Sequence, residues 1–166
     1  MTVKTNRVIG IDPGLTGFVA LLHADTGDVE FSQTPTLKLG KKNDFDLTGM
    51  FNILLEYKGS GVEVIIEHQQ AYPKQGLSST FNAGKGYGLW IMAVHALGMG
   101  YHIISPRKWQ GKVYNGLNGG NPKEKSVIAA QRLFPDVDFR RSPRCKIPDH
   151  NKCDAALIAY YGAHYA

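Results

Sequence analysis

Two short apolar segments, each ending in an acidic residue, constrain this chain more than any other feature of its sequence. Residues 7–12 read Arg-Val-Ile-Gly-Ile-Asp, and residues 62–67 read Val-Glu-Val-Ile-Ile-Glu. Such β-branched runs are typical of buried strands, and Pro13-Gly14 interrupts the chain after the first. A charged side chain is costly to bury unless it has a partner or a ligand. The pattern therefore predicts two central strands, and it indicates that their terminal acids, Asp12 and Glu67, are there for the same reason.

Periodicity along the rest of the chain predicts an α/β layered domain with a mixed sheet. The expected order is three strands, helix, strand, helix, strand and two helices, over residues 7–12, 17–22, 29–33, 46–58, 62–67, 79–99, 101–104, 123–134 and 149–163. Residues 38–42 and 111–122 contain glycine and are interpreted as exposed loops. Because no internal repeat divides the chain, residues 1–166 are expected to form a single domain.

Composition narrows the class of partner. The 166 residues carry a formal net charge of +5 and a pI near 9.2, which favours a polyanionic partner, although many basic proteins bind no nucleic acid.

No apolar run approaches the ~18 residues of a membrane span, and residues 1–7 lack a secretory signal. Cys145 and Cys153 make no disulfide framework, so we expect a reducing cytoplasm. With His150 they supply three ligands at poor spacing, which disfavours a zinc site.

A third acid, Asp154, stands near the start of a nearly all-apolar predicted helix. Hydrolysis of a phosphodiester needs a hydroxide nucleophile and relief of charge on the leaving oxygen. Two hard metal ions supply both, and such ions prefer oxygen ligands. Asp12 alone could be a turn residue, because it precedes Pro-Gly. Glu67 and Asp154 are harder to explain without a ligand, so one metal site accounts for the three acids best.

Five motifs occur in a characteristic order that covers nearly the whole chain: Val8–Gly14, Val64–His68, Gly84–Gly88, Ser105–Trp109 and His150–Ala159. Together they resemble the RuvC-type Holliday junction resolvases, in particular the phage and organellar branch, within the ribonuclease-H-like superfamily. The resemblance implies a ribonuclease-H-like fold, with a mixed five-stranded sheet flanked by helices. It also implies a homodimer that resolves four-way DNA junctions by paired nicks. Two Mg²⁺ ions per active site, for which Mn²⁺ would substitute, and no nucleotide cofactor are expected.

The same resemblance assigns roles to individual residues. Asp12, Glu67 and Asp154 correspond to metal-binding acids. Lys112 and Lys125 correspond to basic residues near the scissile phosphate. The remaining motifs and loops suggest three further DNA-binding residues: Lys85, Arg107 and Lys108. Amides at the start of the helix at 123–134 would also favour a phosphate, but a solvated run of charges is the alternative.

The resemblance also implies an aromatic wedge that unstacks bases at the crossover, which the bacterial members carry three residues after the second acid. This chain has Gln70 at that position, which departs from the bacterial pattern. Tyr72 and Phe81 are therefore the candidates for the wedge.

A second departure concerns the fourth residue of the metal site, which the family places at the position of Asn151. We predict that His150 fills this role, because His150 and Asp154 are four residues apart and share one face of a helix. An imidazole there could bind a metal ion or position the attacking water. Asp149 is predicted to be the N-cap of that helix.

Two equivalent active sites are needed to cut both strands of a two-fold symmetric junction, which is the reason to expect a homodimer. The helix at 79–99 is the expected interface, although its apolar residues could instead belong to the core: Leu89, Trp90, Met92, Ala93 and Ala96.

Other functions share parts of this pattern. Asp12-Pro-Gly-Leu-Thr16 also resembles the phosphate loop of actin-like ATPases, but those proteins need two duplicated domains. A ribonuclease H that cuts RNA–DNA hybrids, or a fork or flap nuclease, would share the fold and the acids. A junction-binding protein without catalysis is disfavoured by the three intact acids. The phage-like motif variants indicate the cytoplasm of a bacterium or phage-infected host, at the nucleoid.

Overall fold

A mixed five-stranded sheet forms the centre of the molecule. The structure is a computed structural model that describes residues 7–166. The strands lie in the order β3-β2-β1-β6-β7. β1 (Arg7–Ile11), β2 (Phe18–His23) and β3 (Val29–Gln33) form an antiparallel meander, while β6 (Val62–Glu67) and β7 (Tyr101–Ile104) run parallel to β1. The predicted α/β class and mixed sheet are confirmed.

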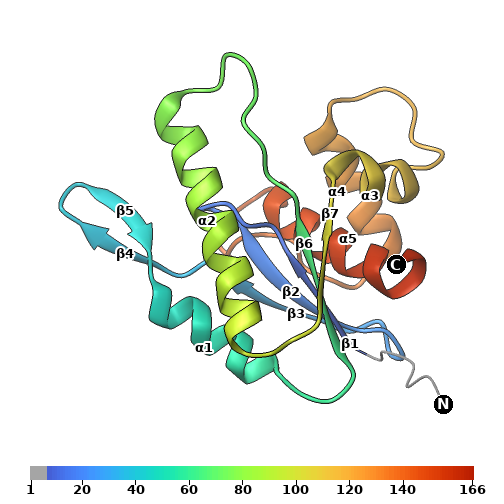
Figure 1. The fold of residues 1–166 in the computed structure, drawn as a ribbon. Helices are drawn as coiled ribbons and strands as arrows, with labels where there is room; N and C mark the ends of the chain where they lie inside the picture. Colours follow the sequence, from blue (N-terminus) through green and yellow to red (C-terminus); the bar gives the residue numbers. More distant parts are fainter. Residues whose placement is uncertain (1–6) are drawn as a thin grey trace.

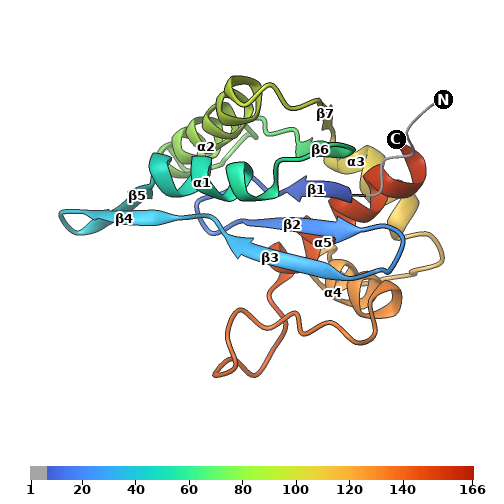
Figure 2. The same cartoon turned by 90° about the horizontal axis from the view of Figure 1, so that it is seen from below.

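Helices cover both faces of this sheet, as Figures 1 and 2 show. α1 (Leu47–Tyr57) and α2 (Leu77–Ala96) lie on one face. α5 (His150–Tyr165) crosses the other face, and α4 (Pro122–Leu133) packs against α5. α3 (Pro106–Val113) follows β7 directly. Between residues 7 and 166, no helix combines the length and the apolar character that a membrane crossing requires.

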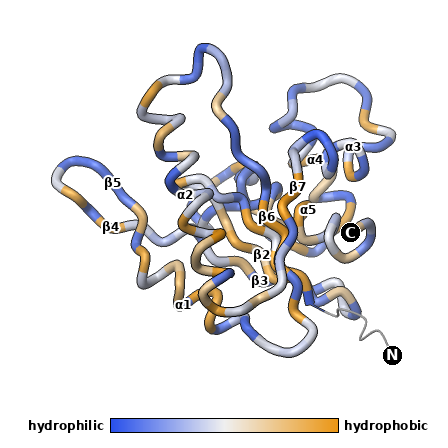
Figure 3. Tube along the Cα trace, in the orientation of Figure 1, coloured by the Kyte–Doolittle hydropathy of each residue, from blue (hydrophilic) through white to orange (hydrophobic). Residues whose placement is uncertain are grey.

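Two apolar cores result, one on each side of the sheet. Alternate residues of each strand point to opposite faces, so Ile9 and Ile11 pack toward α1 and α2, whereas Val8 packs toward α5. Figure 3 shows the hydrophobic residues concentrated on the central strands. The burial of these strands on both faces explains why they read as continuous apolar runs rather than as alternating ones.

α5 approaches β1 unusually closely. A Cβ atom added to Gly10 would lie 2.2 Å from the carbonyl oxygen of Ala155 and 2.4 Å from the backbone nitrogen of Ala159. Gly162, one turn further along, is similarly tight against side chains of the sheet. The small residues at this contact therefore let the backbone of α5 lie directly on β1, which fixes the N-terminal end of α5 beside the end of β1.

Two predictions of local structure were wrong, and one residue of the expected dimer interface belongs to the core. Residues 38–42 are not a plain loop, because they belong to a hairpin of β4 (Thr36–Leu39) and β5 (Lys42–Phe45) that turns at Gly40, which has φ +61°. The proposed loop at 111–122 begins later, since α3 continues through Gly111 to Val113. Trp90 is fully buried in the core and cannot contribute to an interface.

Candidate active site

A cavity of about 320 Å³ opens where β1, β6 and the start of α5 meet. Asp12 follows β1, Glu67 ends β6, and Asp154 lies in the second turn of α5. β1 and β6 are parallel neighbours, so their carboxyl ends reach the same edge of the sheet. We call this cavity the carboxylate pocket; it is lined by Asp12, Glu67, His68, Gln69, Tyr72, Pro106, Gln110, Tyr114, Pro122, Lys123, His150, Asn151 and Asp154.

Both carboxylate oxygens of Glu67 accept a hydrogen bond. The indole Nε1 of Trp109 donates to Oε1 at 2.9 Å, and Nε2 of Gln69 donates to Oε2 at 2.8 Å. Trp109 is fully buried in α3, so its position is fixed by packing. Burial raises the pKa of Glu67, and the two hydrogen bonds oppose that shift because they favour the ionised form. Glu67 is thus oriented by the protein itself.

Asp154 is oriented by the neighbouring helix. The hydroxyl of Ser126, a buried residue of α4, donates a hydrogen bond to Oδ1 of Asp154. Burial raises the pKa of Asp154 to about 7; the Ser126 hydrogen bond opposes this rise and the charge of Glu67 adds to it. α4 therefore contributes directly to the site through Ser126.

Asp12 is half-buried, as are Glu67 and Asp154. Burial raises its pKa well above the ordinary value, and the charges of Glu67 and Asp154 raise it further. The backbone N–H of Gly14 donates to Oδ1 at 3.4 Å, a long contact that also gives Asp12 the turn role considered from sequence. Because these carboxylates repel one another within one pocket, a cation between them would relieve an existing electrostatic cost.

The donor set fits a hard divalent cation, which prefers carboxylate oxygens. Among residues 7–166, however, no three His, Cys, Asp or Glu side chains converge closely enough to form a complete preformed metal site. The acids line one pocket, and the charges of Glu67 and Asp154 both act on Asp12. A larger cavity of about 580 Å³ lies elsewhere, between the β2–β3 turn and residues 133–138, and the predicted site residues do not line it.

The three candidates for the fourth residue of the metal site, Asp149, His150 and Asn151, have different surroundings. Asp149 is the N-cap of α5, as predicted: it accepts the N–H of Asn151 at 2.9 Å and pairs with Arg141. The side-chain amide of Asn151 donates to the carbonyl and hydroxyl oxygens of Thr16, both at 3.2 Å. His150 lines the carboxylate pocket, and burial, followed by the nearby charge of Lys123, lowers its pKa. His150 is therefore neutral near pH 7, the form that can bind metal or accept a proton.

The predicted basic residues do not all lie at the pocket. None of them lines it; the basic residue that does is Lys123, and the ammonium of Lys112 lies 5.7 Å from the ring centre of Tyr165. Lys85 forms an ion pair with Asp44 at 2.6 Å, which ties α2 to the β4–β5 hairpin. The remaining predicted basic residues, on α3 and α4, are exposed or half-buried: Arg107, Lys108 and Lys125.

The two wedge candidates stand at the same end of the molecule. Tyr72 is 54% exposed, follows β6 and lines the carboxylate pocket. Phe81 is 70% exposed on the N-terminal half of α2. Figure 1 shows the β6–α2 connection and this part of α2 extending beyond the end of the sheet. Tyr72 is thus the wedge candidate beside the acids.

Several residues of the site did not emerge as functional from the sequence. Ser126 and Gln69 orient the acids, and Tyr114 and Lys123 line the pocket. Of these, Lys123 had a usable signal, because it follows Pro122 at a predicted helix start. Nothing in the local sequence distinguishes the role of Ser126, which depends on α4 packing against α5.

Comparison with known proteins places this geometry on a familiar scaffold. The RuvC structure of Thermus thermophilus matches at 17% sequence identity and a TM-score of 0.57, over 94% of this chain and 95% of that one. The fold is that of the RuvC resolvases. T. thermophilus RuvC in complex with Holliday junction substrate gives 17% identity and a TM-score of 0.59, over 96% of this chain and 93% of that one. The yeast mitochondrial Holliday junction resolvase Ydc2 matches at 17% sequence identity and a TM-score of 0.55, over 93% of this chain and 76% of that one. No family model and no curated protein sequence matches the chain.

The RuvC fold confirms the predicted ribonuclease-H-like class. The match extends over 94% of this chain. At 17% identity the likeness concerns the backbone, so the roles of individual side chains rest on the pocket described above.

Proposed function

We propose that the chain is a metal-dependent DNA endonuclease that resolves four-way junctions. The observation that carries this proposal is the carboxylate pocket, in which acids from β1, β6 and α5 meet on a RuvC fold. A neighbour with that fold is described in complex with Holliday junction substrate, which supports the choice of substrate.

Asp12, Glu67 and Asp154 would hold two Mg²⁺ ions, with Mn²⁺ as a substitute. When bound, such ions supply a hydroxide nucleophile and neutralise charge on the leaving oxygen. The protein's own contribution is orientation: Trp109 and Gln69 fix the Glu67 carboxylate. Neutral His150 would complete the site, either as a ligand or by holding the attacking water.

Basic residues around the pocket would hold the DNA backbone. Lys123 stands at the rim, in the first turn of α4, where its ammonium could hold a phosphate; the helix start itself is capped, since Asn121 accepts the N–H of Glu124 at 3.1 Å and Pro122 has no N–H. Further phosphate contacts are proposed from Arg107, Lys108, Lys112 and Lys125. Lys85 is less suited to this role because it is paired with Asp44. Tyr72, and further from the acids Phe81, would unstack bases at the crossover.

We further propose a homodimer formed through α1 and α2. A groove of about 200 Å³ between these helices is lined mostly by apolar side chains: Leu47, Met50, Phe51, Leu89, Met92, Ala93 and Ala96. Leu89, Met92, Ala93 and Ala96 of the predicted interface lie there, and Met92 is largely exposed. Light scattering that finds a monomer of 18.3 kDa at tens of micromolar would contradict this interface.

The direct test compares substrates of one length: an immobile four-way junction, a fork, a linear duplex and an RNA–DNA hybrid, each with Mg²⁺ and with chelator. The proposal predicts nicking of the junction with Mg²⁺ only. Preferential cutting of the hybrid would favour a ribonuclease H, and preferential cutting of the fork a different structure-selective nuclease. Binding of ATP in place of junctions would favour the actin-like alternative.

The enzyme would act at the nucleoid, in the cytoplasm of a bacterium or phage-infected host.

A further inference from the structure

A second depression adjoins the carboxylate pocket and has the opposite chemical character. It has a volume of about 390 Å³ and aliphatic walls formed by Val127 and Ile128 of α4 and by Ile147 and Pro148 of the linker before α5. Ile147 is 76% exposed and Ile128 is 52% exposed. We call this depression the apolar groove; the other residues that line it are Lys123, Glu124 and His150.

The apolar groove and the carboxylate pocket share a wall. Lys123 and His150 line both, so a strand whose phosphate lies at the acids would also pass beside the apolar groove. The linker that forms one side also carries Arg144 and Lys146, both exposed. Glu124, the acidic residue of the groove, accepts the backbone N–H of Asn121 at 3.1 Å in the capping box of α4. The groove is therefore apolar inside and mainly basic at its rim.

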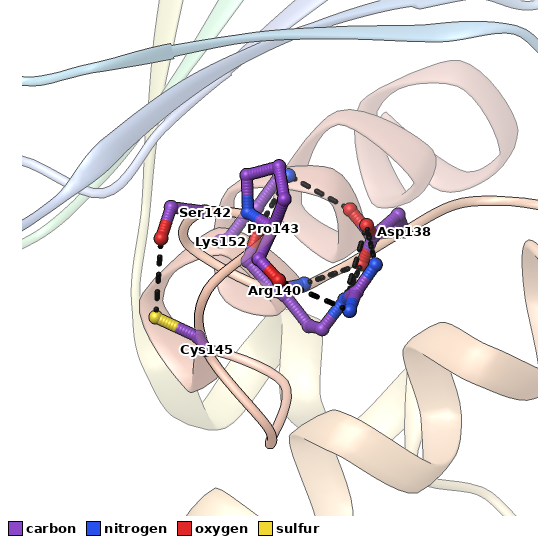
Figure 4. Close-up of polar contacts among 6 residues, drawn as sticks. All are labelled: Asp138, Arg140, Ser142, Pro143, Cys145 and Lys152. Carbon is purple, nitrogen blue, oxygen red and sulfur yellow. Dashed lines mark hydrogen bonds and ion pairs between the residues drawn. The ribbon is translucent and has the colours of Figure 1, made fainter.

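The linker that carries Ile147 is held in place by a network of polar contacts, shown in Figure 4. Lys152 of α5 donates to the carbonyl oxygens of Asp138 at 2.7 Å and Arg140 at 3.0 Å. Arg140 also forms a β-bridge with Pro148, and its guanidinium pairs with the Asp138 carboxylate at 2.8 Å. An exposed isoleucine on a linker fixed at both ends is a preformed surface.

We infer that the apolar groove receives an unstacked base of the cleaved strand, next to the scissile phosphate. Aliphatic side chains can contact the face of any base, and the thymine methyl in particular, while the basic rim holds the flanking phosphates. The inference rests on the proposed function, since the nucleotide reaches the groove only if its phosphate lies in the carboxylate pocket. The groove would then contribute to the choice of cutting position.

The test uses the full chain and junctions that carry 2-aminopurine at one position, scanned across the mapped nick site, in the presence of chelator so that the strands stay intact. 2-Aminopurine brightens when it leaves a base stack, and an aliphatic groove does not quench it. We expect a bright position beside the nick with the wild-type protein and with I103S, a matched isoleucine that is 44% exposed on β7. The brightening should be lost with the double variant I128S/I147S and reduced with I147S.

Single-turnover cleavage by I128S/I147S should slow by about tenfold at the preferred position, while junction affinity changes less, because phosphate contacts dominate affinity. Equal brightening and equal cleavage by the wild type and both groove variants would overturn the inference. It would equally fall if no position beside the nick brightened, or if the double variant became monomeric where the wild type is dimeric, because the groove would then join two copies. A wild-type protein that neither binds nor cuts junctions would instead overturn the proposed function.

Discussion

At the scale of single residues, each acid of the carboxylate pocket accepts at least one hydrogen bond from the protein. Variants that remove the charge of one acid but keep its shape can therefore separate metal binding from DNA binding. D12N, E67Q and D154N each remove a charge with little change of shape. We expect each to reduce cleavage at least ~1,000-fold and to leave junction affinity equal or higher, because the loss of a negative charge does not remove a phosphate contact. Nicking rates and gel-shift titrations measure the two quantities.

Glu63 provides the control for these variants. It lies on the same strand as Glu67 but pairs with His102 at 2.6 Å, away from the pocket. E63Q should therefore cut normally. Near-wild-type cleavage by any one of D12N, E67Q or D154N would remove that acid from the metal site.

His150 is the residue whose role the surroundings separate best from that of its neighbours. Asp149 is engaged by Arg141 and by the start of α5, and Asn151 holds Thr16, whereas His150 faces the pocket. H150A should lower the single-turnover rate by ~100-fold, the range for a positioned acid–base group, with unchanged thermal stability. D149A should instead lower the melting temperature through loss of the cap.

The histidine control is H164A, at the exposed far end of α5, which should cut at the wild-type rate. If N151A proves to be the crippled variant while H150A cuts normally, the assignment of His150 is wrong.

At the scale of elements, the contact between α5 and β1 decides whether Asp154 reaches Asp12. G10A would place a methyl group against the backbone of α5 at Ala155 and Ala159. We expect G10A to cost about 1–3 kcal/mol of unfolding free energy, as overpacking does, and to reduce cleavage, since α5 must move away. Chemical denaturation and nicking rates measure the two effects.

Gly88 of α2 is the matched position, because a Cβ atom added there meets nothing within 4 Å. G88A should stabilise the protein by about 0.5–1 kcal/mol, the usual gain for alanine in a helix. A neutral effect of G10A on both stability and cleavage would contradict the close contact that places Asp154.

The elements also mark how far sequence reasoning reached. Asp12 and Glu67 were predicted to share a site because each ends an apolar strand, where an unpartnered charge is costly; the parallel pairing of β1 and β6, which brings them to one edge, came only from the structure. α3 was missed because Gly111 was taken as a loop signal, but the buried residues of this helix outweigh the low helix propensity of glycine. For Trp90 the sequence left an interface and the core open, because helical spacing identifies an apolar face without showing what covers it; the structure buries Trp90 in the core.

At the scale of the whole molecule, the half-buried acids of the carboxylate pocket make folding depend on pH, and on the proposed metal. The raised pKa of Asp154, about 7, means that the folded state binds this proton more tightly than the unfolded state. This stabilising contribution is complete below the unfolded pKa near 4 and is lost as the pH rises through about 7. With chelator, the melting temperature should therefore fall from pH 5 to pH 8, and Mg²⁺ should restore several degrees at pH 8 because it binds the folded state.

D154N isolates this effect, since other groups titrate in the same range. His150, for example, has a lowered pKa and makes a contribution of opposite sign. The melting temperature of D154N should fall less from pH 5 to pH 8 than that of the wild type, and Mg²⁺ should raise it less. Identical pH profiles for the variant and the wild type would show that Asp154 is not the buried acid described here.

Resolution of a junction requires two coordinated nicks, and a supercoiled plasmid that extrudes a cruciform reports them in one reaction. Paired cuts across the cruciform give linear plasmid, whereas a single cut releases the supercoiling, removes the cruciform and leaves a nicked circle. The proposed metal-dependent dimer predicts linear plasmid with Mg²⁺, none with chelator or with D12N, and none from a plasmid without the inverted repeat. Nicked circles alone, or equal cutting of both plasmids, would contradict junction resolution.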